Sequence, residues 1–307
     1  MSDSANTIRE TTRIVTAHHQ QEGAGFIVRR PFPSLGLEQV DPFLMVDEMG
    51  PVTYAPGEAV GAPDHPHRGF ETVTYTLEGE FEHEDSAGHR GVLRAGDVQW
   101  MTAGAGVIHS EMPSRRIREQ GGRVHGFQIW VNLPKRLKLS RPRYQEVPAT
   151  SIPEGHSADA RAHVRVIAGE ALGARAVIDT HTPIVFQDWT LESGADVTIP
   201  LDSGYRAFVY VFAGAARIGN AEAAVEDGQM ALLGPGDALR LRGVEGATTP
   251  ARLLLLGGVP IGEPVARYGP FVMNTRQELL QAFEDFQSGR MGEITRTAEL
   301  RGSNPPA

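Results

Sequence analysis

Short apolar runs separated by glycine, proline and aspartate turns make up most of the chain. Examples are residues 70–77 and 98–102 in the first half and residues 207–212 and 252–256 in the second. Runs of four to eight β-prone residues bounded by turn residues are typical of strands rather than long helices. The pattern therefore predicts an all-β protein.

One segment near the end of the chain follows a helical pattern instead. Thr275 and Glu278 have the spacing of a capping box, in which each side chain satisfies a backbone N–H of the first turn. Gly289 is placed to end the helix. Apolar residues recur between them at helical spacing: Leu279, Leu280, Phe283 and Phe286. We expect a short C-terminal packing helix.

The strand pattern occurs twice, which predicts two related domains. Residues 75–79 (YTLEG) resemble residues 210–214 (YVFAG), and the Gly-Asp turn at 96–97 resembles the one at 236–237. Residues 134–162 are rich in proline and charge, a composition that suits a connection between domains. We expect a β-barrel in residues 1–133, a connection in 134–162, and a second barrel with the helix in 163–307.

Composition narrows the classes of function. The chain of 307 residues carries 29 basic and 38 acidic residues, a net charge of −9, and contains no cysteine. An acidic chain is poorly suited to neutralise phosphates, so we expect no direct nucleic-acid contact. Without cysteine, a metal must be held by His, Asp or Glu. The first thirty residues lack an apolar signal segment and no apolar run approaches 18 residues, so we expect a soluble, cytoplasmic protein without a membrane anchor.

Two pairs of metal-ligating residue types occur in the first half at a spacing of two. His65 and His67 form one pair, and His109 and Glu111 form the other. Residues i and i+2 of a strand point to the same face. If both strands face the interior of one barrel, three imidazoles and one carboxylate converge on a metal ion.

Several alternatives stay open at this point. A lone His-x-His pair is more often a surface feature than a ligand pair, and Glu71 is a rival carboxylate for Glu111. The other histidines are expected to make hydrogen bonds or lie at a rim (His83, His89 and His125) or to lie on the surface (His18, His19, His156, His163 and His181). Three His and one Glu suit Fe(II), and also Mn, Ni, Co, Cu or Zn, with two positions left open on an octahedral ion.

The second half does not repeat these ligands. The repeat offsets carry the four positions onto Pro200, Asp202, Thr249 and Ala251, and no histidine follows His181. We therefore expect one metal per chain, in the N-terminal half.

Several longer motifs resemble the pirin family of the cupin superfamily. They are residues 65–80 (HPHRGFETVTYTLEGE), 83–89 (HEDSAGH), 96–104 (GDVQWMTAG), 108–113 (IHSEMP), 126–133 (GFQIWVNL), 260–264 (PIGEP) and 269–274 (GPFVMN). The resemblance covers about residues 20–292. It implies a bicupin fold, with one iron held in the N-terminal barrel by His65, His67, His109 and Glu111.

The resemblance also implies quercetin 2,3-dioxygenase activity on a flavonol-like substrate and dioxygen. A metal would lower the pKa of the flavonol hydroxyl, and Glu111 or Glu71 would accept its proton. Apolar residues such as Phe70, Trp100 and Phe127 are expected either to stack on the flat substrate or simply to pack in the core. The alternative that the resemblance implies is a metal- and redox-sensing regulator that binds a transcription factor or a metabolic enzyme.

Overall fold

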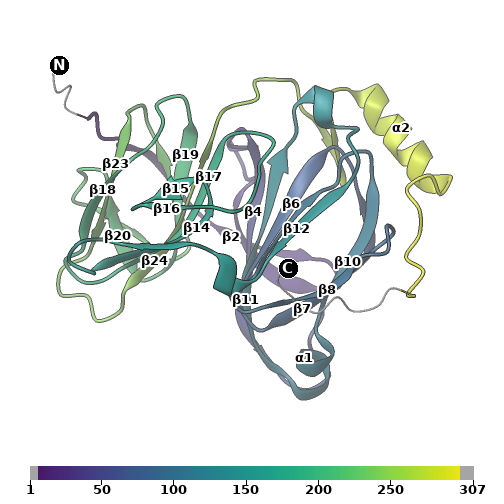
Figure 1. Ribbon diagram of the computed structural model, residues 1–307, viewed down its shortest axis with the longest axis horizontal. Helices are drawn as coiled ribbons and strands as arrows, with labels where there is room; N and C mark the ends of the chain where they lie inside the picture. The colour runs from purple at the N-terminus through teal and green to yellow at the C-terminus, as the bar shows by residue number, and fades with distance from the viewer. Residues whose placement is uncertain (1–5, 298–307) are drawn as a thin grey trace. The chain divides into compact units, whose positions relative to one another are not determined.

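The computed structural model describes residues 6–297, and most of its regular structure is β-strand (Figure 1). The chain forms two compact units. The N-terminal unit contains residues 19–39, 43–149 and 261–297, and the C-terminal unit contains residues 6–18, 40–42 and 150–260. The predicted all-β class is confirmed, and no helix among residues 6–297 is long and apolar enough to cross a membrane.

The ends of these units differ from the boundaries expected at 133 and 163. Residues 6–18 belong to the C-terminal unit, where strand β1 (Thr11–Thr16) pairs with strand β22 (Gln229–Leu233). Residues 261–297 belong to the N-terminal unit, where the N–H of Val272 donates to the carbonyl of Arg68. Neither segment takes part in the internal repeat, so the repeat carried no information about where each one packs.

The N-terminal unit contains a seven-stranded and a four-stranded antiparallel sheet. The larger has the order β12 (Arg143–Val147), β9 (Val98–Thr102), β6 (Phe70–Glu78), β11 (Gly122–Asn132), β4 (Phe43–Tyr54), β3 (Phe26–Phe32) and β2 (His18–Glu22). The smaller has the order β5 (Ala62–His67), β10 (Val107–Pro113), β7 (Glu80–Asp85) and β8 (Arg90–Arg94). The remaining elements are α1 (Arg115–Gln120), η1 (Lys135–Leu137), the hairpin β25 (Ala266–Tyr268) and β26 (Phe271–Met273), and α2 (Arg276–Gln287).

The C-terminal unit repeats this plan. Its seven-stranded sheet has the order β1, β22, β19 (Arg206–Ala213), β24 (Ala251–Gly258), β17 (Ile184–Leu191), β14 (Ala162–Ala168) and β13 (Glu154–His156). Its four-stranded sheet has the order β18 (Asp196–Pro200), β23 (Ala238–Gly243), β20 (Ala215–Ile218) and β21 (Ala224–Glu226). The short strands β15 (Glu170–Ala171) and β16 (Ala174–Arg175) pair with each other, and the 3₁₀ turn η2 (Ala149–Ser151) lies where the chain enters this unit.

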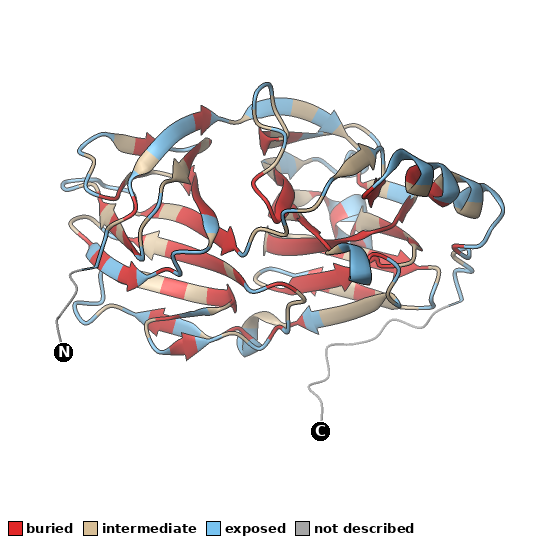
Figure 2. Ribbon diagram, turned by 90° about the horizontal axis from the view of Figure 1, so that it is seen from above, coloured by how far each residue is buried: buried red, intermediate tan, exposed pale blue. Residues whose placement is uncertain are grey.

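Both sheets of the C-terminal unit contribute to one apolar core. Trp189 and Leu253 of the larger sheet pack in the same cluster as Ile218 and Leu241 of the smaller one. Figure 2 shows the buried positions distributed along the strands, as expected when alternate residues of each strand point inward. The residues of this apolar cluster offer a metal no ligands.

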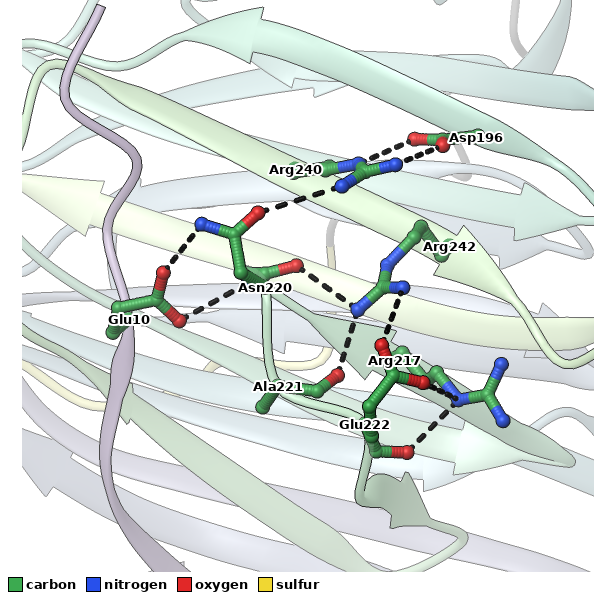
Figure 3. A network of polar contacts seen from close by, with 9 residues as sticks. Glu10, Asp196, Arg217, Asn220, Ala221, Glu222, Arg240 and Arg242 are labelled. Atoms are coloured by element: carbon green, nitrogen blue, oxygen red, sulfur yellow. Dashed lines mark hydrogen bonds and ion pairs between the residues drawn. The ribbon is translucent and has the colours of Figure 1, made fainter.

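A polar network fastens the segment before β1 to the C-terminal unit (Figure 3). The carboxylate of Glu10 accepts hydrogen bonds of 2.7 and 3.0 Å from the side-chain amide and backbone N–H of Asn220. The guanidinium of Arg240 reaches Asn220 on one side and pairs with Asp196 on the other. These contacts attach Glu10, the residue before β1, to the same unit in which β1 pairs with β22.

The expected C-terminal helix is confirmed. α2 spans Arg276–Gln287, and Thr275 and Glu278 form the reciprocal capping box. Leu279 and Ala282 of this helix are buried against the hairpin residues Phe271 and Met273. The helix therefore covers part of the N-terminal unit with a narrow apolar face, while much of its surface stays exposed (Figure 2).

Candidate metal centre

Three histidines meet where strands β5 and β10 pair in the N-terminal unit. His65 lies directly opposite His109 in the antiparallel register, and His67 follows two residues after His65. The ring centroids of the three imidazoles lie 4.4–4.9 Å apart. One nitrogen from each ring falls within 4.8 Å of the other two. The structure thus brings together the three histidines that the spacing singled out.

Backbone carbonyls orient two of these rings. Nδ1 of His65 lies 2.7 Å from the carbonyl oxygen of Pro63, and Nδ1 of His67 lies 3.4 Å from that of Pro270. In each case the Nδ1–H donates to the carbonyl, which leaves the lone pair of Nε2 free. A hydrogen bond of this kind selects the tautomer with which a histidine binds a metal.

His109 lies deepest in the cluster. Its side chain is fully buried, and neither ring nitrogen has a hydrogen-bond partner among the described residues. A buried polar atom without a partner costs on the order of 1–3 kcal/mol. A divalent cation at the centre of the three rings would satisfy one of these nitrogens, so the residues present fit a metal.

Burial also keeps two of the rings in the form that binds metals. Desolvation lowers the pKa of His67 and of His109 well below the ordinary value of 6.5, and the neighbouring histidines lower both pKa values further. Both rings are therefore neutral at neutral pH. A metal ion entering the site displaces no proton from either one.

Glu111 lies beside the histidines but is not part of the cluster of three. The hydroxyl of Thr74 donates a 2.6 Å hydrogen bond to its Oε1, and Nε2 of Gln128 lies 3.4 Å from its Oε2. A β-bulge separates His109 from Glu111 on the side that pairs with β5. The carboxylate is held on the cavity wall at the edge of the cluster.

Glu71, the rival carboxylate, lies on the opposite face of its strand. Thr74 of β6 faces Glu111, and residues an odd number of positions apart on a strand point to opposite faces. Glu71 instead accepts a 2.7 Å hydrogen bond from Thr102, its direct partner on β9. This geometry favours Glu111 as the carboxylate of the site.

A cavity of about 590 Å³ opens at the cluster. His65, His67 and Glu111 form part of its wall, and Phe26, Phe81 and Trp130 contribute aromatic surface. Its size falls in the range of sites for small organic ligands, about 300–1,000 Å³. The candidate metal centre is therefore accessible to a small molecule.

Two arginines also line this cavity. Arg30 forms a bidentate ion pair with Asp47 and lies 2.6 Å from Glu22, so its charge is compensated. The guanidinium of Arg267 lies 4.7 Å from the centroid of the Trp130 ring, where the attraction of a cation to an aromatic face contributes about 0.5–2 kcal/mol.

The three aromatic residues considered for substrate stacking pack in the core. Phe70, Trp100 and Phe127 are each at most 1% exposed, and none lines the cavity. Trp100 and Phe127 lie opposite Val73 and Tyr75 of β6, on the face turned away from Thr74. The core-packing alternative is confirmed for them, and Trp130 lies at the cavity instead.

The expected hydrogen-bonding histidines do make such bonds. His83 lies 2.6 Å from Glu146, His89 lies 3.0 Å from Asp85, and His125 lies 2.8 Å from Glu48. None of the three lines the cavity.

Sequence reasoning missed Thr74, Gln128 and Arg267. Thr74 and Gln128 are direct partners across β6 and β11, so only the strand register places them on the face that holds Glu111. Arg267 reaches the cavity from a segment that follows the C-terminal unit in the chain. No local spacing in the sequence marks any of the three.

Comparisons with known proteins agree with the fold. A family model described as Pirin matches residues 25–131, and one described as Pirin C-terminal cupin domain matches residues 186–292. A pirin-like protein of Solanum lycopersicum is 42% identical over 95% of this chain and 96% of its own length. Pirin of Homo sapiens is 40% identical over 92% of this chain and 94% of its own length.

A solved structure is similar over nearly the same span. A quercetin 2,3-dioxygenase from Acinetobacter baumannii has a TM-score of 0.86 and 38% identity, covering 94% of this chain and 100% of that chain. The two family matches together cover both units, and the predicted bicupin fold is confirmed. With two cupin domains and relatives at about 40% identity along its length, the chain belongs to the pirin family.

Proposed function

We propose that this protein is a metal-dependent dioxygenase that opens the ring of a flavonol such as quercetin. The observation that carries the proposal is a cavity of about 590 Å³ whose wall includes His65, His67 and Glu111, with the buried imidazole of His109 completing the histidine cluster behind it. The similar Acinetobacter baumannii structure, described as a quercetin 2,3-dioxygenase, supports the choice of substrate class.

The donor set suits a divalent transition metal, which we propose to be iron. His65, His67 and His109 would hold the ion, with Glu111 as the fourth ligand or as a base beside it. Imidazole and carboxylate donors also accept Mn, Ni, Co, Cu or Zn. The bound metal supplies Lewis acidity, which lowers the pKa of a hydroxyl group placed against it.

Glu111 is placed to accept the proton of the flavonol 3-hydroxyl. A general base must come within about 3 Å of the proton that it removes. The Thr74 hydrogen bond restrains one carboxylate oxygen, and Gln128 lies next to the other. These contacts keep the carboxylate directed along the cavity wall, so that little reorganisation accompanies the proton transfer.

The remaining wall positions the flat substrate and limits water. Phe26, Phe81 and Trp130 provide aromatic surface, and Met45 and Met49 add flexible apolar contacts. In the proposed reaction one dioxygen adds both atoms to one flavonol, and the central ring opens with release of carbon monoxide. No external reductant is needed, because the flavonol itself supplies the electrons.

The test is turnover of quercetin in air by the iron-loaded protein. We expect the flavonol absorbance to fall and carbon monoxide to appear at a rate well above that of iron alone. The His109→Ala variant should lose both the iron and the turnover, whereas His19→Ala, at an exposed position, should retain both. Failure of the wild-type protein to exceed the metal-only control would overturn the proposal, and recovery of a specific protein partner would then favour a regulatory role.

A further inference from the structure

A second group of metal-ligating side chains lies in the C-terminal unit, outside its apolar core. Glu154 and His156 belong to the edge strand β13, and His163 belongs to the neighbouring strand β14. One ligand atom from each residue lies within 4.8 Å of the others, the same limit that the three histidines of the N-terminal unit satisfy. Spacing alone did not reveal this group, because its third member is separated by a turn.

The strand register explains why the three side chains share a face. His156 lies directly opposite His163, and Glu154 precedes His156 by two positions on the same strand. Residues at i and i+2 and direct cross-strand partners all point to one side of a sheet. The two imidazole rings have centroids 4.5 Å apart and an interplanar angle of 25°.

The turn between the strands holds this pair in register. The N–H of Ser157 donates to the carbonyl of Ala162, and the N–H of Ala162 donates back to the Ser157 hydroxyl oxygen, at 2.8 and 2.9 Å. The Ser157 hydroxyl in turn donates to Asp159 at 2.6 Å. These bonds lie next to the His156–His163 pair and fix the backbone of the turn. Binding of an ion would therefore require little further ordering of the backbone at this site.

The carboxylate of Glu154 is oriented toward the histidines. Its Oε1 lies 3.3 Å from the guanidinium of Arg165, its cross-strand partner, while its Oε2 lies 3.1 Å from Nε2 of His163. The arginine therefore holds one oxygen and leaves the other directed at the imidazole pair. Both partners remain partly exposed, with side chains 47% and 29% accessible for Glu154 and His163, so an ion can reach the group from solvent.

We propose that Glu154, His156 and His163 bind a second divalent transition-metal ion, independent of the centre in the N-terminal unit. Two imidazoles and a carboxylate with an open fourth position are a donor set that Zn²⁺ accepts in tetrahedral geometry. The same borderline donors also accept Cu²⁺ and Ni²⁺, whereas Mg²⁺ and Ca²⁺ prefer oxygen ligands only. This proposal differs from the sequence prediction of one metal per chain, and it does not depend on the proposed oxygenase activity.

The decisive experiment measures Zn²⁺ binding in a protein whose first centre is disabled. Equilibrium dialysis of the His109→Ala variant against Zn²⁺ should still yield one bound ion per chain, and the double variant His109→Ala/His163→Ala should bind none. His109→Ala/His181→Ala is the matched control and should bind as the single variant does. Excess Mg²⁺ should not displace the ion. Equal Zn²⁺ binding with and without His163, or none in either, would overturn the proposal.

A second readout uses the wild-type protein loaded with its first metal. Diethylpyrocarbonate acylates accessible neutral imidazoles, and mass spectrometry of peptides locates each modified residue. We expect Zn²⁺ to reduce the labelling of His156 and His163 together while leaving His19 unchanged. A Glu154→Gln variant should need more Zn²⁺ for the same protection, because the site loses its negative charge. If Zn²⁺ did not change the labelling of these two histidines, the result would contradict the proposed site, even if dialysis showed that Zn²⁺ binds elsewhere.

Discussion

The hydroxyl of Thr74 donates a 2.6 Å hydrogen bond to Oε1 of Glu111, and this contact joins the two sheets of the N-terminal unit at the candidate metal centre. Thr74 belongs to β6 of the seven-stranded sheet, and Glu111 belongs to β10 of the four-stranded sheet. A carboxylate on the wall of the cavity at the histidine cluster is thus oriented by a residue far from it in sequence. Outer contacts of this kind orient metal ligands and bases.

Replacing Thr74 by valine should weaken metal binding without disturbing the fold. The substitution keeps the shape of the side chain but removes the hydroxyl that restrains Glu111. We expect the affinity for Fe²⁺ to fall about tenfold, the lower end of the range for outer-contact substitutions. Competition with a chelator of known affinity measures the change. The matched control is Thr76→Val on the same strand face, where the buried Oγ1 has no hydrogen-bond partner among the described residues. Equal losses in both variants would contradict this role of Thr74.

The variants Glu111→Gln and Glu71→Gln should show which of the two carboxylates acts as the base. If Glu111 is the base, its amide variant loses a proton acceptor, and turnover of quercetin should fall by about 100-fold or more. Glu71→Gln should keep most of the activity, because Glu71 faces away from Thr74 and bonds to Thr102. Initial rates at saturating quercetin, with iron content measured for each variant, provide the comparison. A larger loss of turnover in Glu71→Gln than in Glu111→Gln would identify Glu71 as the base instead.

Fe²⁺ should stabilise the N-terminal unit of the wild-type protein and leave that unit of His109→Ala unchanged. A ligand that binds only the folded state adds about 4 kcal/mol to the free energy of unfolding at a thousandfold excess over its Kd. Thermal unfolding of the metal-free N-terminal unit should therefore shift upward when Fe²⁺ is added under anaerobic conditions. Because removal of the His109 imidazole takes away a central ligand, the shift should vanish in that variant. A shift of the same size in both proteins would mean that the metal binds elsewhere.

Local patterns were sufficient to predict the three histidines. His65 and His67 are two positions apart on one strand, so their common direction follows from strand geometry alone. The direct opposition of His65 and His109 could not be predicted in the same way, because it depends on which strands pair and in what register. The resemblance to the pirin family supplied that information indirectly.

What remained hidden depended on long-range packing. The C-terminal residues 261–297 join the N-terminal unit, and they bring Pro270 within 3.4 Å of His67 and Arg267 to the cavity wall. A domain boundary drawn from an internal repeat cannot anticipate a terminal segment that packs with the other half. The pair of His156 and His163 was missed for a related reason, because its members meet only when a turn brings β13 and β14 into register.

Acid should destabilise the metal-free protein through His67 and His109. Burial lowers the pKa of both below 6.5. Below pH 6.5 the histidines of the unfolded chain become protonated, while those of the folded chain stay neutral. The unfolded state therefore binds more protons, and the free energy of unfolding decreases as the pH is lowered. Each histidine contributes a slope of up to about 1.4 kcal/mol per pH unit in this window.

Urea unfolding at pH 7.5 and 5.5, in the presence of a chelator, measures this dependence. In the His109→Leu variant, the free energy of unfolding should depend less on pH, by the amount that one histidine contributes. The stability of this variant at pH 5.5 should approach or exceed that of the wild type, because a buried polar ring without partners has been removed. The exposed His19→Leu variant is the control and should keep the wild-type slope. An unchanged slope in His109→Leu would show that this histidine is accessible to protons in the folded state.

Lys138 is a buried cation next to the segments that carry His67 and Pro270. Its ammonium donates to the carbonyls of Gly69 and Val272, at 2.7 and 3.1 Å, and to Oδ1 of Asn132 at 2.6 Å. Burial lowers its pKa to about 8, so the group is charged at neutral pH and has a proton for each of the three oxygens. Gly69 follows His67 by two residues and Val272 follows Pro270 by two, so the lysine ties together both sides of the His67–Pro270 contact.

Lys138→Met should therefore reduce both stability and metal affinity. Three buried oxygens lose their donor, and at about 1–3 kcal/mol for each unsatisfied group the loss should be at least about 3 kcal/mol. Lys135→Met, at an exposed position in the same turn, should change the free energy of unfolding by less than about 0.5 kcal/mol. Urea unfolding gives the stability, and chelator competition on the folded fraction gives the affinity. If Lys138→Met lost stability but bound Fe²⁺ as tightly as the wild type, the lysine would support the fold without positioning His67.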